Sequence, residues 1–512
     1  MFTLSKKLLL ISLLTLSHMV VRGQFSLNGQ IRTRTEYRDG LGNLPAIGSK
    51  PAAFTSQRTR LIFGYKWDRV TFNTSVQDVR VWGQDAATIN NADGSRLMVH
   101  EANAEVVLAN VADTTIKFKA IQNLSLKIGR QELVYDDVRL LGNLDWLQQA
   151  RRFDVAMLKA QHLGWLVDIG GGFNQNSDAF GVSGTFYTPG NVPASVLSNK
   201  NVSLGIPSGF IPTSGKGGAP VLATPLSTNG QNQQFKSFQM IYLTRKFKQT
   251  KFSGLFFKDD FSKYIIDSVG NATQGYVYGR RYNQTGVNSR LTYGLMLNNQ
   301  FGNASSLLGK VQSQAWFYAQ SGKDRDGLTI KNAYHYGAFF MIQKGNFSFG
   351  PGYEVLSGNN TISPTAGQTS KFDPLYGTPH KHWGYMDYFY VGTGSAAGGL
   401  KDGYLKGKYI YKIFTFSLDA HSFALEKSMP NKLDSNKPLD KKLGTEIDFL
   451  LNFNLNKFTN IELGYSHMKG SNSLEYSKAA TWDKTQKNAN WAYLMLNIRP
   501  DFFYTKPVAI KQ

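Results

Sequence analysis

Short segments in which apolar and polar side chains alternate recur along most of the chain. In the segment 58–67 the apolar side chains share one parity and the basic ones the other: Thr59, Leu61, Phe63, Tyr65 and Trp67 against Arg58, Arg60, Gly64 and Lys66. An extended backbone turns successive side chains to opposite faces, so this pattern predicts a β-strand with one apolar and one polar face. A soluble sandwich exposes its polar face to solvent, whereas a membrane barrel turns it toward a lumen.

The number and length of these segments favour a membrane barrel. Comparable alternation is found, among other places, at 24–38, 71–82, 97–108, 287–295, 334–342, 405–413, 447–455 and 490–499. With weaker candidates the total is about 18 segments, each near the roughly 9–11 residues that cross a bilayer as a tilted strand. Repeated arginine on the polar parity favours a lumen over a sandwich face. We therefore predict an all-β fold, a transmembrane antiparallel β-barrel of about 18 strands, wide enough to hold water or inward-folded loops.

Two further stretches predict the direction of particular side chains. Phe153 and Val155 alternate with Asp154, which places a charged group inside a strand, and in a barrel we expect that group to face the lumen. Phe238 and Met240 are expected on the outward face of a later strand.

The N-terminus predicts export. Lys6 and Lys7 precede an apolar run at 8–16, and small residues lie near Gln24. This arrangement is typical of a cleaved signal peptide over residues 1–23, and the mature barrel is expected over 24–512. Residues 174–234 are rich in Gly, Ser, Asn and Pro without a sustained period, so a long loop is expected around 175–234.

Charge and composition restrict the classes of molecule that the protein is expected to bind. The formal net charge is +22, which biases the protein toward anionic partners. The export signal and the lack of a nucleic-acid-binding motif argue against nucleic acid, so acidic polysaccharide, small anions and outer-membrane lipid remain. A solvated basic surface unrelated to any cargo is an alternative of similar weight. The chain has no cysteine, so no disulfide contributes to folding.

The sequence contains no convincing catalytic or metal motif. His380 and His382 form a pair without an evident third ligand, and the adjacent Asp136 and Asp137 are expected to point apart. No nucleophile elbow or phosphate-binding loop is present. We expect no catalytic residue, metal or cofactor, although an outer-membrane enzyme with an active site at the rim remains an alternative from another class.

The candidate site is a set of charged groups on strands and in one loop. A guanidinium group binds a carboxylate through two parallel hydrogen bonds and stays charged, so a ladder of them offers weak sequential sites for carboxylated cargo. Acidic neighbours would position the arginines and keep binding weak. The predicted pore-lining residues are Arg32, Arg34, Arg58, Arg60, Arg80, Arg130, Arg139, Arg152, Asp154, Arg290, Lys406 and Lys408.

Two sequence blocks resemble a known family. The first reads GRQELVYDDVRLLGNLDWLQQARRFD at 129–154; the second comprises YEVLSG at 353–358, FDPLYG at 372–377 and YMDYF at 385–389. Together they resemble the signature of the alginate export family of bacterial outer-membrane proteins.

The resemblance implies an 18-stranded barrel in the bacterial outer membrane, with possible periplasmic export partners. It also implies passive diffusion of an anionic, alginate-like polysaccharide or other anionic solutes, with Arg130, Arg152 and Asp154 at the constriction. The parity of Arg130 differs from the lumen face, so we expect a bulge or loop to redirect it. A substrate-specific porin for small organic acids is the alternative.

Overall fold

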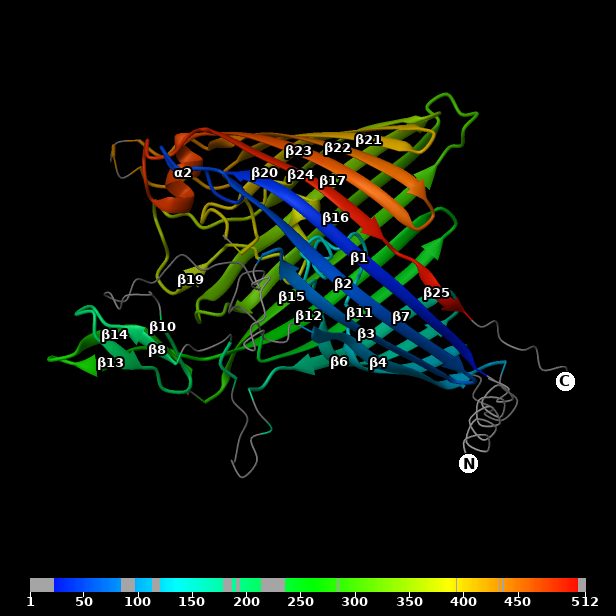
Figure 1. Ribbon diagram of the computed structural model, residues 1–512, viewed down its shortest axis with the longest axis horizontal. Coiled ribbons are helices and arrows are strands. Elements are labelled where there is room, and N and C mark those ends of the chain that lie inside the picture. The colour runs from blue at the N-terminus through cyan, green and yellow to red at the C-terminus, as the bar shows by residue number, and fades with distance from the viewer. Residues whose placement is uncertain are drawn as a thin grey trace, which may run out of the picture.

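The chain closes into a single antiparallel β-barrel of 18 strands, as predicted (Figure 1). The computed structural model describes residues 23–83, 97–112, 120–176, 178, 187–189, 194–212, 235–282, 285–392, 394–431, 433–434 and 437–504. The predicted signal peptide lies outside the described residues, except for its last residue, and so does much of the loop expected around 175–234.

Each barrel strand pairs with its neighbours in chain order, and β24 pairs with β1 to close the sheet. The barrel strands are β1 (Gln24–Asp39), β2 (Ala52–Trp67), β3 (Val70–Val81), β4 (Leu97–Asn110), β5 (Asn123–Gln131), β6 (Phe153–His162), β7 (Trp165–Phe173), β11 (Ser237–Phe247), β12 (Thr250–Ser262), β15 (Val287–Phe301), β16 (Lys310–Lys323), β17 (Thr329–Lys344), β18 (Phe347–Leu356), β20 (Leu400–Tyr411), β21 (Phe414–Ala424), β22 (Lys442–Asn456), β23 (Thr459–Gly470) and β24 (Asn488–Ile498).

Loop lengths distinguish the two ends of the barrel. Tight turns such as those after β2 and β11 join strands at one end, whereas the long connections leave from the other. Bacterial barrels have short periplasmic turns and longer extracellular loops, so the end with the long connections is the extracellular one.

The elements outside the barrel strands are short. They are β8 (Ser195–Leu197), β9 (Ser203–Gly205), β10 (Phe210–Pro212), β13 (Ile265–Asn271), β14 (Gly275–Arg281), β19 (Gln368–Thr369), η1 (Pro379–Lys381), α2 (Asn472–Ala479) and β25 (Asp501–Tyr504). In Figure 1, α2 and the β13–β14 hairpin lie at the end of the barrel opposite to β25. In the described part of the chain, no helix is long and apolar enough to cross a membrane.

Most strands follow the predicted alternation. On β2, Arg58 and Arg60 are buried inside the barrel while Leu61 on the opposite face is exposed. On β17, Tyr336 and Phe340 are exposed on the outward face. These strands satisfy their backbone groups with their neighbours and turn apolar side chains outward, as a lipid-facing wall requires.

The expectation for β6 and β11 is wrong. Phe153 and Val155 on β6, and Phe238 and Met240 on β11, are buried on the inner face, which turns Asp154 outward. The physical reason is that the barrel has an apolar interior here: these side chains belong to one hydrophobic cluster that includes residues of two inward-folded loops. Parity alone cannot distinguish an apolar face against lipid from one against such loops.

Candidate functional site

Two long loops fold into the lumen and pack on one another. The first, residues 132–152, follows β5, and the second, residues 357–399, follows β18. They join through backbone hydrogen bonds from Gly142 N to Tyr376 O (3.0 Å) and from Thr378 N to Val138 O (2.8 Å). The two blocks that carry the family resemblance are therefore in direct contact, although they lie far apart in the sequence.

The arginines of β1 and β2 hold the first loop against the wall. Arg58 forms an ion pair with Asp145 (2.8 Å) and donates to the backbone oxygen of Gln148 (3.3 Å). Arg32 also reaches Asp145 (3.2 Å), and Arg34 donates to the backbone oxygen of Trp146 (2.7 Å) while stacking on its ring. All three arginines are buried; Arg32 and Arg58 pair with Asp145 of the loop, whereas Arg34 also pairs with Glu36 on β1 (2.9 Å).

Asp145 is held ionised by these arginines. Burial alone would raise the pKa of this loop carboxyl group, but the Arg58 and Arg32 guanidinium groups outweigh it and keep the pKa below its ordinary value. The loop therefore carries its negative charge at neutral pH.

Arg139 anchors the same loop to another part of the wall. Its guanidinium pairs with Asp137 (2.9 Å) and with Glu354 on β18 (2.7 Å), and its Cζ atom lies 3.6 Å from the ring centre of Trp316. Burial and the positive charge of Arg139 lower the pKa of the neighbouring His382 to about 3, so this imidazole is neutral.

Arg290 anchors the second loop. It donates to Asp259 on β12 (3.0 Å) and to Asp373 in the loop (2.9 Å), and Tyr376 of the loop also donates to Asp259 (2.9 Å). Buried charges need such partners because an isolated one is costly to desolvate. Together these contacts connect both inward loops to the barrel wall.

Three predicted residues lie away from the lumen. Arg80 is on the outward parity of β3 and pairs with Asp78, opposite to the inward Gln77. Arg130 and Asp154 pair across β5 and β6 (2.9 Å), also on the outward parity. No bulge redirects Arg130, because β5 pairs with β6 in regular register throughout. The expectation that these three line the pore is corrected.

The remaining predicted residues have varied surroundings. Arg60, on the inner face, donates to Gln77 (2.7 Å). Arg152 precedes β6, and its guanidinium lies 3.7 Å from the sulfur of Met98. Lys406 faces inward on β20 and pairs with Asp419 (2.7 Å).

A basic cavity lies between the loops and the inner wall. It has a volume of about 280 Å³ and is lined by Arg139, Lys381, Lys406, Lys408, Asp137, Asp419, Phe339, Tyr385 and Tyr404, among others. In the part of the chain that the structure describes, the exposed ammonium groups of Lys381 and Lys408 have no ion-pair partner. Cations beside aromatic rings can hold a carboxylated ring, so this cavity is the candidate substrate site.

Sequence reasoning missed the acidic side of the lumen. Glu354, Asp402, Asp419, Glu446 and Asp448 lie on the inner face of β18 and β20–β22, in a different sector from the arginines of β1 and β2. The alternation in these strands already placed several of the acids on the polar parity. The inner wall therefore carries these acidic side chains and the arginines of β1 and β2 in separate sectors.

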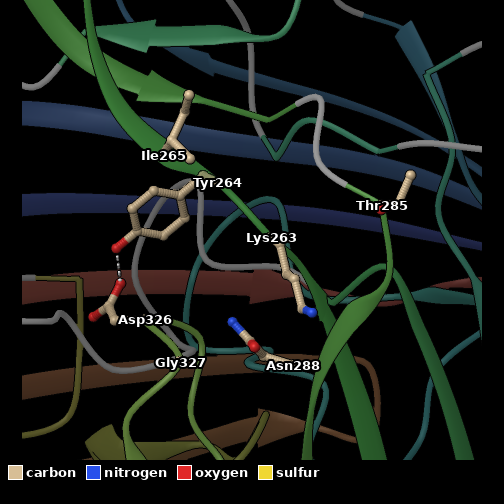
Figure 2. Close-up of a pocket in the computed structure, with 7 residues that line it drawn as sticks. All are labelled: Lys263, Tyr264, Ile265, Thr285, Asn288, Asp326 and Gly327. Atoms are coloured by element: carbon tan, nitrogen blue, oxygen red, sulfur yellow. Dashed lines mark hydrogen bonds between the residues drawn. The ribbon is translucent and has the colours of Figure 1, made fainter. Parts of the chain in front are cut away.

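A second pocket lies near the extracellular end, at the bases of the β12–β15 and β16–β17 connections (Figure 2). It has a volume of about 380 Å³, and Tyr264 donates to Asp326 (2.5 Å) at one side while Lys263 and Asn288 lie at the other. Both charge signs are present, so the pocket has no marked preference for anions.

The closed barrel, its apolar outer face and its inward loops define an outer-membrane channel, located in the bacterial outer membrane. Residues 24–170 match the model of the family described as alginate export, which confirms the resemblance seen in the sequence. No curated protein sequence matches the chain.

Solved structures share the fold across nearly the whole chain. OccAB4 of Acinetobacter baumannii is 12% identical with a TM-score of 0.54, covering 94% of this chain and 98% of its own. OccK9 (OpdG) of Pseudomonas aeruginosa is 13% identical with a TM-score of 0.53, covering 93% and 98%. The outer membrane protein OpdK of Pseudomonas aeruginosa is 8% identical with a TM-score of 0.52, covering 93% and 99%. At these identities the similarity concerns the fold alone.

Proposed function

We propose that this channel passes anionic, carboxylate-bearing solutes across the outer membrane by passive diffusion and performs no chemistry on them. The observation that carries the proposal is the lumen cavity with the ammonium groups of Lys381 and Lys408 exposed to it. Among the described residues these ammonium groups have no fixed counter-ion, so they would attract a passing carboxylate. Transport requires that each site attracts the solute but also releases it. The buried arginines support the site indirectly because they hold the loops that form it.

Two kinds of cargo fit this proposal. The small cavity and the packed loops favour a small organic acid or a single acidic sugar, because about 280 Å³ suits one ring. The family match over residues 24–170 favours an anionic, alginate-like polysaccharide, which would need the inward loops to move. Periplasmic export partners are proposed only with the second cargo.

The charge of the cavity can be tested in planar bilayers. The double variant Lys381→Glu/Lys408→Glu should shift the reversal potential in a salt gradient toward cation selectivity, because four units of charge change at the cavity. Lys457→Glu, at a periplasmic turn beside Phe458, is the matched control and should change it little. Equal reversal potentials for the double variant and the wild type would refute the anion site.

Cargo size is tested in the same bilayers. Blocking of the current by short polyuronates at concentrations where monomeric uronate or aromatic acids have no effect would support the polysaccharide. The reverse order would support the small acid. A lack of interaction with either would contradict both.

We also propose that residues 1–23 are removed on export and that 24–512 form one barrel domain with an extracellular connection around 175–234. N-terminal sequencing of the protein from outer membranes should begin at Gln24. A retained N-terminus would contradict this processing.

A further inference from the structure

A bulge in β4 places two consecutive side chains on the inner side of the barrel. Ser75 of β3 pairs with Glu101 and Val76 pairs with Val99, so His100 is the extra residue of the bulge. In a regular strand His100 and Glu101 would face opposite sides, but a bulge sets two residues opposite one. His100 is fully buried, and both side chains reach toward the start of the first inward loop.

Glu132 completes the cluster. It directly follows β5, at the point where loop 132–152 leaves the wall. His100 Nε2 lies 2.8 Å from Glu132 Oε1, and the Glu132 backbone N–H donates to Glu101 Oε1 (3.3 Å). The Asn143 side chain donates to the other Glu132 oxygen (2.7 Å), which fixes the orientation of this carboxylate.

These three residues have the composition and spacing of a metal site. Their ligand atoms all lie within 4.8 Å of one another, which no other group of three such side chains in the described part of the chain does. Two ligand atoms at about 2.1 Å from one ion lie roughly 3.0–3.4 Å apart in octahedral or tetrahedral geometry, so small side-chain rotations suffice. One imidazole with two carboxylates suits borderline divalent ions and balances a charge of two.

We propose that His100, Glu101 and Glu132 bind a divalent transition ion of the Zn²⁺ type, which ties the start of loop 132–152 to β4. Asn143 is the positioning residue for Glu132. This site would add to the wall contacts that Arg32, Arg34, Arg58 and Arg139 already make with loop 132–152, and would make the rigidity of the loop depend on metal.

The site is tested with the full mature chain, refolded in detergent, stripped with a chelator and titrated with Zn²⁺ by calorimetry. The wild type and His467→Ala, whose histidine lies on the outward parity of β23 and contacts Asn490, should bind one ion with equal affinity. His100→Ala and Glu132→Gln should bind about 10-fold or more weakly. Absence of one-to-one binding to the wild type, or equal binding by all four proteins, would overturn the site.

X-ray absorption of the Zn²⁺-loaded wild type keeps the proposal testable if a variant does not fold. A first shell with one imidazole and oxygen ligands supports the site. A shell with two or more imidazoles, or with oxygen alone, refutes it.

Discussion

Replacing Arg58 with Met should release loop 132–152 from the barrel wall. Arg58 is buried and makes an ion pair with Asp145 (2.8 Å), a hydrogen bond to the Gln148 backbone oxygen (3.3 Å) and two hydrogen bonds to Gln30. Methionine fills much of the same volume but makes none of these bonds, so the loop loses its closest attachment to β2.

The free-energy cost of Arg58→Met depends on the interactions that Asp145 keeps in the variant. Removing one partner of a buried ion pair typically costs about 3–5 kcal/mol. Asp145 keeps Arg32 at 3.2 Å, and its side chain is 38% exposed, so water can solvate part of the freed carboxylate. We therefore expect a loss of about 2–3 kcal/mol in the free energy that holds the loop closed. This corresponds to a roughly 30- to 150-fold rise in the opening equilibrium.

Amide hydrogen exchange in detergent micelles measures this opening directly. The backbone N–H groups of Leu147, Ala150 and Arg151 bond within the loop and should lose protection by that factor. Arg80→Met is the matched control, because Arg80 also pairs with an aspartate but lies on the outward face of the adjacent strand. Unchanged protection in Arg58→Met, or an equal loss in both variants, would refute the role of Arg58 as a loop anchor.

The remaining predictions concern the same loop and the strand before it. The lowered pKa of Asp145 means that its contribution is present above the unfolded pKa of about 3.9 and is lost as pH falls through the lower folded value. Loop protection factors should therefore fall in the wild type as the pH decreases below about 4, and Asp145→Asn should already show reduced protection at pH 7. A variant with the full wild-type pH response would contradict this. Gly129 has φ +116° and a Cβ there would lie 2.3 Å from a carbonyl oxygen of β4, so Gly129→Ala should lower the thermal unfolding midpoint of the barrel in gel-shift assays. Gly254→Ala, where the nearest atom is 3.5 Å away, is the control, and an equal midpoint for the two variants would count against strain at Gly129.

The sequence predicted only some of the cationic residues that line the basic cavity. The alternation at 405–413 places Lys406 and Lys408 on the polar parity, and both line the cavity. Lys381 comes from a loop without any period, so only the packing of that loop brings it to the same place. The three anchor arginines Arg58, Arg139 and Arg290 were recognisable as lumen candidates, but their partners on the loops were not.

By itself, the sequence determined the class of the protein. Period-2 alternation over segments of bilayer length depends only on local backbone geometry, so it predicted the strands, their approximate number and the outward faces of most of them. Only the tertiary structure decided which side of β6 and β11 is inside, because Phe153 and Phe238 pack against loops that are remote in the chain. The same long-range packing decided that Arg32 and Arg58 bind Asp145 while Arg80 and Arg130 face outward. The local sequence pattern predicts whether a strand face is apolar or charged. Whether lipid, water or another part of the chain packs against that face is decided by the closed barrel and its inward loops.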